Sequence, residues 1–196
     1  FIANILVLGG VRNGFGIFVE IWEKEFYAST ASISFAASIG LLTQGIAQPI
    51  LGRLADIYGG RIIILNTMII LVLGGFAIAF ANGVLFLIFI YGIIISFASG
   101  GIGGSVGGVV IVRWFRKRRG TALSVLAAGG SVGGLICVPF MAYIMDLYNW
   151  RVSWIVLGFL GVISIPVIWI IIKNRPSELG MGPDGENYDK SKNINN

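Results

Sequence analysis

A single ionisable residue, Arg12, lies in the middle of the apolar stretch Phe1–Ile21. Its guanidinium carries five N–H donors in a planar fork, which matches a carboxylate or a phosphate. A charge in apolar surroundings is costly, so Arg12 should face a water-filled cavity or a partner. On a helix, Asn13 falls within the same polar arc. We therefore expect Arg12 and Asn13 to be candidate ligands for an anion.

Two other interpretations of Arg12 stay open. It could pair with an acid contributed from outside these residues, because no acid lies deep in the apolar stretches of this chain. Alternatively, the membrane boundary could lie nearer to Arg12 than the length of the apolar stretch indicates. Either arrangement would satisfy the charge without a ligand.

A second polar face is predicted on the stretch Ile33–Leu51, where Gly40, Gln44 and Gln48 recur at helical spacing. Gln44 could line a water-filled path, which makes it a further candidate for substrate binding. It could also bond to a neighbouring helix, which is the commoner use of polar side chains between membrane helices.

The hexapeptide Gly-Gly-Ser-Val-Gly-Gly occurs twice, at Gly103–Gly108 and at Gly129–Gly134. Both copies fit the G-x-S-x-G pattern of serine hydrolases, which requires a base, usually histidine, to activate the serine. The chain has no histidine, and no lysine lies inside an apolar stretch. The sequence therefore predicts no catalytic residue. With one cysteine, Cys137, it also predicts no disulfide, metal site or cofactor.

The composition indicates a membrane protein. Of 196 residues, 56% are hydrophobic and only 12% are charged, whereas soluble domains carry about a quarter charged residues. The net charge of +5 does not predict nucleic-acid binding, because the basic residues lie in short loops between apolar runs. Each apolar run is long enough to cross a bilayer as a helix. We expect an all-α, polytopic fold with helices at Phe1–Ile21, Ile33–Leu51, Ile62–Ala81, Val84–Val112, Thr121–Ile144 and Val152–Ile172, followed by a cytoplasmic linker over residues 173–196.

The distribution of lysine and arginine predicts the orientation. One side of the membrane receives only Lys24 and Arg151. The other side receives Arg53, Arg61, Arg113, Arg116, Lys117, Arg118, Arg119, Lys173, Arg175, Lys190 and Lys192. We expect this richly basic side, and with it both ends of the chain, to be cytoplasmic, and we expect a multi-pass protein of the plasma membrane.

Small residues predict where the helices touch, because lipid gives helices no hydrophobic reason to associate. On the fourth predicted helix they recur every four residues, at Gly92, Ser96, Gly100, Gly104 and Gly108. On the fifth they form the pairs Gly129–Gly133 and Gly130–Gly134. We interpret both patterns as packing faces.

The segment between the second and third predicted helices reads Gly-Arg-Leu-Ala-Asp-Ile-Tyr-Gly-Gly-Arg, from Gly52 to Arg61. It resembles the cytoplasmic loop motif G-x-L-A-D-x-x-G-x-[RK] of the major facilitator superfamily. The resemblance implies that Gly52, Asp56, Gly59 and Arg61 act as a conformational latch and do not bind substrate. Gly60 stands where the family usually has a basic residue.

A narrower resemblance begins at Trp114 and runs into the fifth predicted helix. It is similar to the monocarboxylate transporter signature YFxKRRxLAxGxAxAG, with agreement at Phe115, Lys117, Arg118, Arg119, Ala122, Ala128 and Gly129. Trp114 is an aromatic substitution, and Thr121, Ser124 and Leu126 depart from the pattern. Asn149-Trp150-Arg151 and Arg175–Gly180 also look like bacterial members of the monocarboxylate or oxalate/formate branch. Independently of family, the basic run would fix topology and attract anionic lipid headgroups.

The resemblance implies a fold of twelve helices in two six-helix halves, with substrate bound between the halves and alternating access by rocking. This chain then supplies the first half. The implied function is secondary transport, as symporter or antiporter, of a small organic anion such as a monocarboxylate, with protons as one candidate coupling ion. The expected partners are this anion, protons, membrane lipid and a second six-helix half, with no nucleic acid. The alternatives are a non-transporting membrane sensor or scaffold of the same fold, and a six-helix channel.

Overall fold

The computed structural model describes residues 2–174, 176, 180 and 182. Within them the chain is helical and contains six segments long and apolar enough to cross a membrane. Most of the expected linker, including Arg175 and residues 177–179 of the segment from Arg175 to Gly180, lies outside the described residues. The elements are α1 (Ile2–Asn4), η1 (Ile5–Asn13), α2 (Gly14–Phe26), α3 (Thr30–Tyr58), α4 (Gly60–Ala79), α5 (Val84–Leu87), η2 (Ile88–Ile95), α6 (Ser96–Gly100), α7 (Gly104–Trp114), α8 (Arg119–Leu147) and α9 (Trp150–Ile171).

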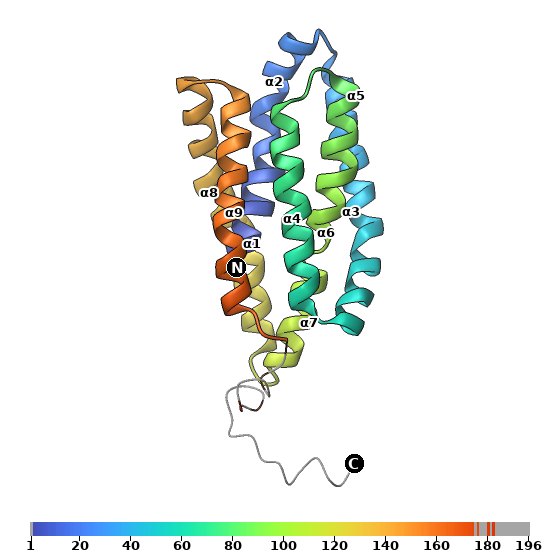
Figure 1. Cartoon of the computed structure of the whole chain (residues 1–196), viewed down its shortest axis with the longest axis vertical. Helices are drawn as coiled ribbons and strands as arrows, with labels where there is room; N and C mark the ends of the chain where they lie inside the picture. The colour runs from blue at the N-terminus through green and yellow to red at the C-terminus, as the bar shows by residue number, and fades with distance from the viewer. Residues whose placement is uncertain (1, 175, 177–179, 181, 183–196) are drawn as a thin grey trace.

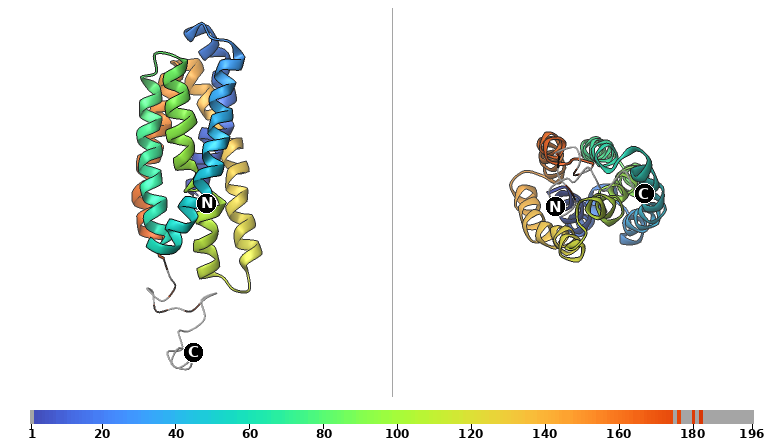
Figure 2. Two further views of the ribbon diagram at one scale, coloured as in Figure 1. Left: turned by 90° about the vertical axis from the view of Figure 1, so that its right-hand side faces the viewer. Right: turned by 90° about the horizontal axis from the view of Figure 1, so that it is seen from below.

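The six spans run roughly along one long axis (Figure 1). The first consists of α1, η1 and α2, and the fourth consists of α5, η2, α6 and α7. The elements η1 and η2 are π-helices, which are rare and occur often at functional sites. The other spans are α3, α4, α8 and α9. Figure 2 shows the bundle from the side and from below.

Three spans differ clearly from the helices expected from hydropathy alone, and the first of them continues to Phe26, beyond the expected end at Ile21. The helix α3 begins at Thr30, where the Ser29 side chain accepts a hydrogen bond from the backbone N–H of Ser32. It continues to Tyr58, so most of the expected loop motif forms the last turns of this helix. Apolar composition marks the lipid-facing part of a helix, and a helix can continue into the aqueous boundary beyond it.

The fourth span is interrupted. The helix α6 ends at Gly100 and α7 begins at Gly104, with a non-helical turn over Gly101–Gly103. At Gly101 an added Cβ would lie 2.9 Å from the hydroxyl of Thr67 on α4. Glycine permits this close approach and lowers helix propensity in the same place. The expected helix over Val84–Val112 is therefore divided into two parts.

Three packing interfaces organise the bundle. The helix α8 packs on η1, α9 packs on α4, and α3 packs on η2 and α6. Aromatic rings from the first, fourth and sixth spans form a cluster in the core: the rings of Phe15 and Tyr91 lie 4.5 Å apart, and those of Trp22 and Trp154 lie 6.4 Å apart. Large apolar side chains such as Leu42 and Leu135 remain 70% and 78% exposed, as suits surfaces that meet lipid or another helical unit.

Charged groups join the loops at one end of the bundle. The Glu25 carboxylate accepts from the indole N–H of Trp150 and from the guanidinium of Arg151. Arg151 also donates to the carbonyl of Ala81 at 3.1 Å, and its guanidinium lies 4.4 Å from the centre of the Trp150 ring. The first, third and sixth spans are thereby joined at the end opposite the basic loop.

Candidate functional site

The position of Arg12 follows from the packing of η1. On one side of η1, Gly9 lies directly against the backbone of Gly133 on α8. The neighbouring Gly10 lies against the side chain of Leu157 on α9. Because these glycines turn one side of η1 toward α8 and α9, Arg12 projects on another side, toward α3 and the fourth span.

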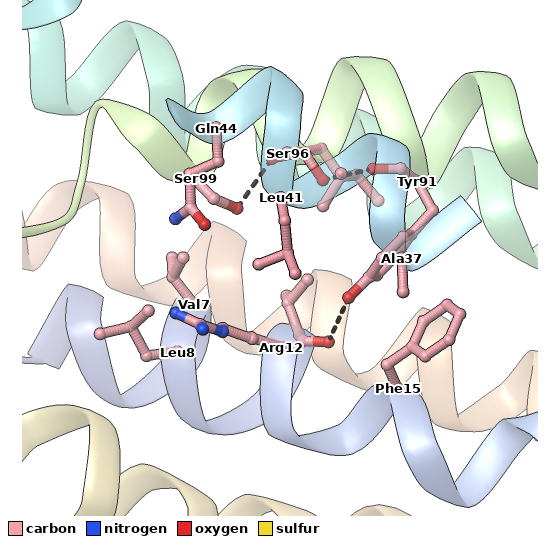
Figure 3. A pocket seen from close by; sticks show the side chains of 13 residues that line it. Val7, Leu8, Arg12, Phe15, Ala37, Leu41, Gln44, Tyr91, Ser96 and Ser99 are labelled. Atoms are coloured by element: carbon pink, nitrogen blue, oxygen red, sulfur yellow. Dashed lines mark hydrogen bonds between the residues drawn. The ribbon is translucent and has the colours of Figure 1, made fainter. Parts of the chain in front are cut away.

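Arg12 lines a cavity of about 220 Å³ between η1, α3, η2 and α6 (Figure 3). The other polar side chains of its lining are Gln44, Tyr91, Ser96 and Ser99. Apolar walls are supplied by residues that include Val7, Phe15 and Ile95. In the close-up, the guanidinium of Arg12, the amide of Gln44 and the hydroxyl of Ser99 lie toward one end of the cavity, and Tyr91 and Phe15 lie toward the other.

The guanidinium of Arg12 has no hydrogen-bond or ion-pair partner among the residues that the structure describes. No acidic side chain is among those that line the cavity. Ion pairs made by Lys24, Arg113 and Arg151 lie elsewhere in the described part of the chain. An unpaired guanidinium near the middle of a membrane span is an expensive arrangement, and an anion in the cavity would offset its cost.

Three hydroxyl groups in the cavity wall are held by backbone carbonyls. Ser99 donates to the carbonyl of Ile95 at 2.8 Å, and Ser96 donates to the carbonyl of Tyr91 at 2.8 Å. The Tyr91 hydroxyl donates to the carbonyl of Val11 at 3.4 Å, which joins η2 to η1. All three residues are buried.

Of the three residues predicted from sequence to bind substrate, the structure brings two together. Arg12 and Gln44 line the same cavity. Asn13 does not line it, and its side-chain amide donates to the carbonyl of Gly130 on α8 at 3.4 Å. Successive residues of a helix point about 100° apart, which is enough to place Arg12 and Asn13 against different neighbours.

Sequence reasoning missed Tyr91 and Ser99 as cavity residues, and it assigned Ser96 to packing alone. Tyr91, Ser96 and Ser99 are spaced by five and three residues along an otherwise apolar span. Ser96 and Ser99, three residues apart, share one face of a helix, and this pair is the signal that could have indicated a polar wall. Tyr91 joins them through the π-helix η2, which has more residues per turn than the α-helix expected from sequence.

A larger recess of about 580 Å³ lies at the basic end of the bundle, between α4, α7, α8 and α9 and beside Asn4. Its lining is mainly apolar, and its charged residues, Arg118 and Lys173, lie at ends of the helices. The cavity at Arg12 is the better candidate for a solute site, because its charge and its polar groups meet near the middle of the spans.

The residues of the predicted latch join α3 to the fourth span. Arg113 of α7 lies 3.7 Å from the Asp56 carboxylate, and it donates to the backbone carbonyl of Asp56 at 3.1 Å. Gly52, one helical turn earlier, lies beside Ser105 at the start of α7. These contacts lie at the basic end, and none of their residues lines the cavity that holds Arg12.

Arg61 connects α4 to the end of α9. Its guanidinium lies 4.2 Å from the centre of the Trp169 ring and donates to the Trp169 carbonyl at 2.7 Å. Its backbone N–H donates to the side chain of Asn174 at 2.9 Å. Gly59 has φ +93°, and an added Cβ would lie 2.7 Å from Asn174, so only glycine suits this turn. The neighbouring Gly60 lies directly against Val110 of α7, where a larger side chain would displace that helix.

The residues of the second family motif lie outside the cavity. The Trp114 indole donates to the carbonyl of Lys173 at 3.0 Å, and Arg119 donates to the carbonyl of Phe115 at 2.8 Å. Lys117 and Arg118 are exposed in and beside the turn before α8, whereas Gly129 is buried within α8. These contacts link the connection between α7 and α8 to the end of α9, and the role of the basic residues in topology stays a prediction.

Comparison with known proteins finds relatives that are named as transporters. The chain is 26% identical over 175 residues to "Uncharacterized MFS-type transporter YcxA" of Bacillus subtilis, covering 86% of this chain and 42% of that protein. It is 26% identical over 151 residues to "Monocarboxylate transporter 13" of Rattus norvegicus, covering 77% and 35%. It is 24% identical over 184 residues to "Monocarboxylate transporter 14" of Homo sapiens, covering 94% and 35%. The chain thus spans less than half the length of these relatives.

The family comparison extends over almost the whole chain. The profile described as "Major Facilitator Superfamily" matches residues 1–190. This match agrees with the six apolar spans. It also agrees with the motif from Gly52 to Arg61 that crosses from α3 to α4. The chain is therefore an integral, multi-pass membrane protein that belongs to the major facilitator superfamily.

Proposed function

We propose that this chain forms the first six-helix half of a secondary transporter for a small organic anion, a monocarboxylate in the first instance. The observation that carries the proposal is Arg12, which faces a mid-span cavity without a protein anion among the described residues. Relatives named as monocarboxylate transporters support the same substrate class. Transport, and not catalysis, is the activity that this site supports.

In this proposal Arg12 binds the carboxylate through its planar fork, and Gln44 adds a hydrogen bond at the same end of the cavity. A second six-helix half closes the open side of the cavity, and rocking of the halves exposes it to each side of the membrane in turn. The residues Gly52, Asp56, Gly59 and Arg61 control this motion at the basic end. We place that end in the cytoplasm because of its excess of arginine and lysine.

If transport is coupled to protons, we propose that the proton carrier lies in the second half. The arginine in the cavity does not release its proton in a protein. Glu20 and Asp146 are exposed near the end of the bundle that is opposite the basic loop. Histidine, the usual switch near neutral pH, is absent from this chain.

The direct test is equilibrium binding of butyrate to the purified whole protein. Arg12→Gln should weaken binding about 10- to 100-fold, because a charge-assisted hydrogen bond contributes about 1.5–3 kcal/mol. Arg12→Lys should retain part of the affinity, since it keeps the charge and loses the fork. The control is Arg53→Gln, because Arg53 is exposed on α3 and does not line the cavity.

Unchanged affinity in Arg12→Gln would contradict the proposal. Flux in proteoliposomes separates the other functional classes. Binding without flux would favour a sensor or scaffold. Flux that does not saturate with substrate would favour a channel.

A further inference from the structure

Tyr91 of η2 contacts the first span on either side of Arg12 in the chain. Its hydroxyl donates to the carbonyl of Val11 at 3.4 Å, and Val11 directly precedes Arg12 on η1. Its ring lies 4.5 Å from the ring of Phe15, which follows Arg12 by three residues. Figure 3 shows the bond crossing the cavity from the fourth span to the first. Tyr91 therefore joins the cavity wall to the backbone that carries the guanidinium.

Tyr91 is itself firmly held in the fourth span, and only 6% of it is exposed. Its carbonyl accepts from the Ser96 hydroxyl at 2.8 Å and from the Ser96 backbone N–H, which closes the last turn of η2. Its ring also packs edge-on against Trp154 of α9, with the ring centres 6.3 Å apart. Because these contacts already order the side chain, little further entropy is lost when its hydroxyl bonds to the first span.

The direction of Arg12 depends on the geometry of η1. A π-helix is rare, so contacts with neighbouring elements must favour it here over an α-helix. Gly9 and Gly10 supply such contacts on the side of α8 and α9, and Tyr91 supplies one on the side of the cavity. A change of η1 toward an α-helix would turn Arg12 by about the angle of one residue, which is roughly 100°. Asn13, one residue later, contacts α8 and does not line the cavity, so a turn of this size can remove a side chain from it.

From these contacts we propose that Tyr91 is a positioning residue for Arg12. Its hydroxyl holds the carbonyl of Val11 so that the guanidinium faces the cavity, and it does not itself bind the solute. The hydroxyl proton is already donated to Val11, and Tyr91 lies toward the other end of the cavity from the guanidinium (Figure 3). The inference rests on the anion site proposed for Arg12.

The first experiment removes the hydroxyl alone. Tyr91→Phe keeps the ring and its contacts with Phe15 and Trp154. We expect butyrate to bind the purified whole protein about fivefold more weakly, which corresponds to one hydrogen bond. The matched control is Tyr143→Phe on α8, because Tyr143 is 62% exposed and does not line the cavity. It should leave the affinity for butyrate unchanged.

A double-mutant cycle tests whether Tyr91 acts through Arg12. In a protein that already carries Arg12→Gln, the further change Tyr91→Phe should have no effect on the affinity for butyrate, because no guanidinium is left to position. If the two losses of affinity multiply instead, Tyr91 contacts the solute directly. That outcome would overturn the positioning role.

Hydrogen–deuterium exchange tests the contact between the two spans in the absence of any solute. Tyr91→Phe should speed the exchange of the backbone N–H groups of η1 severalfold, because the bond to Val11 no longer restrains this helix. Tyr143→Phe should leave the exchange of η1 unchanged. If exchange in η1 is the same with and without the Tyr91 hydroxyl, the hydroxyl does not hold this helix and the inference is wrong.

The outcomes separate this inference from the proposed function. Unchanged butyrate affinity in Tyr91→Phe, with affinity lost in Arg12→Gln, would overturn the role of Tyr91 and leave the anion site standing. Absence of butyrate binding by the unaltered protein, or binding that is indifferent to Arg12→Gln, would overturn the anion site. The positioning role would then fail with it, whatever the exchange of η1 shows.

Discussion

Gly9 of η1 and Gly133 of α8 cross with their backbones in direct contact: a Cβ added to Gly133 would lie 2.9 Å from the Cα of Gly9 and 2.7 Å from the Cα of Ile5. Close approach of this kind lets membrane helices gain van der Waals contact that lipid cannot supply. Because Arg12 follows Gly9 by three residues on the same π-helix, this crossing also determines how the guanidinium is presented to the cavity.

The first prediction concerns this crossing. Gly133→Ala should destabilise the protein by about 1–3 kcal/mol, because the new methyl group meets backbone atoms that cannot move aside independently. The measurement is the fraction that remains folded on heating in detergent. Gly75→Ala is the matched control: Gly75 is buried in α4, yet a Cβ there would meet nothing within 4 Å.

Both substitutions raise helix propensity by a similar amount, so the difference between them reports the contact alone. If the Gly133→Ala variant melts at the same temperature as the Gly75→Ala variant, the backbones of η1 and α8 do not lie as close together as the structure shows. In that case Arg12 is positioned by something other than the glycine contact.

The second prediction separates two glycines that the sequence pattern treats alike. Gly100→Ala should reduce the yield of folded protein, because its Cβ would lie 2.9 Å from the Cβ of Ala47 and 3.3 Å from the carbonyl oxygen of Gln44. Gly104→Ala should be tolerated, since a Cβ there would meet nothing within 4 Å. The measurement is monodisperse protein recovered after extraction. Equal recovery of the two variants would contradict the packing described for α3 and α6.

The different surroundings of Gly100 and Gly104 show where sequence reasoning succeeded and where it failed. The small-residue ladder is confirmed at Gly92 and Gly100, which lie against α3. It is wrong at Gly104, because the turn over Gly101–Gly103 interrupts the helix and ends the regular advance of 100° per residue. A periodic pattern identifies a face only while the helix continues. The four-residue spacing does not show the interruption, whereas the density of glycine at Gly100–Gly104 lowers helix propensity there.

The candidate site was predictable to a similar extent. Arg12 and Gln44 stood out because they are polar residues in apolar surroundings, a signal that exists in the sequence itself. Their meeting in one cavity depends on how η1 and α3 pack, as does the turning of Asn13 toward α8. Ser99 could be taken for a packing residue, and only the position of its hydroxyl in the cavity wall separates the two roles.

The third prediction concerns Asp56 and Arg113. The Asp56 side chain is 64% exposed, and the pair is 3.7 Å apart, so its contribution to stability is at most about 1 kcal/mol. Asp56→Asn should therefore slow transport while leaving equilibrium substrate binding nearly unchanged. Arg113→Gln should reproduce the effect, because it removes the other partner. The measurements are initial uptake rates in proteoliposomes and affinity in detergent.

A large loss of affinity in either variant would contradict the assignment of this pair to conformational switching. It would mean that contacts at the basic end determine the shape of the cavity. An unchanged uptake rate in both variants would instead remove the latch role proposed for Asp56.

The fourth prediction concerns Asn174, which caps a helix far from it in sequence. The helix α4 begins at Gly60, after a glycine that has no side chain to offer its first N–H groups. The Asn174 side-chain oxygen accepts from the Arg61 N–H at 2.9 Å and supplies this missing cap. Loss of an N-cap costs about 1 kcal/mol. Asn174→Ala should therefore lower the melting temperature by about 2–4 °C for a chain of this size.

Substitution by aspartate tests the cause of this effect. Asn174→Asp keeps an oxygen in the same place and adds a negative charge, which is favourable at a helix N-terminus. It should melt at or above the temperature of the unaltered protein, whereas Asn174→Ala should melt below it. Asn66→Ala on α4 is the control, because the Asn66 side chain is exposed and makes no hydrogen bond within the described part of the chain. If Asn174→Asp lowers the melting temperature as much as Asn174→Ala does, the start of α4 does not depend on a hydrogen-bond acceptor at this position. The contact of Asn174 with Gly59 would then have to stabilise this end of the bundle through packing alone.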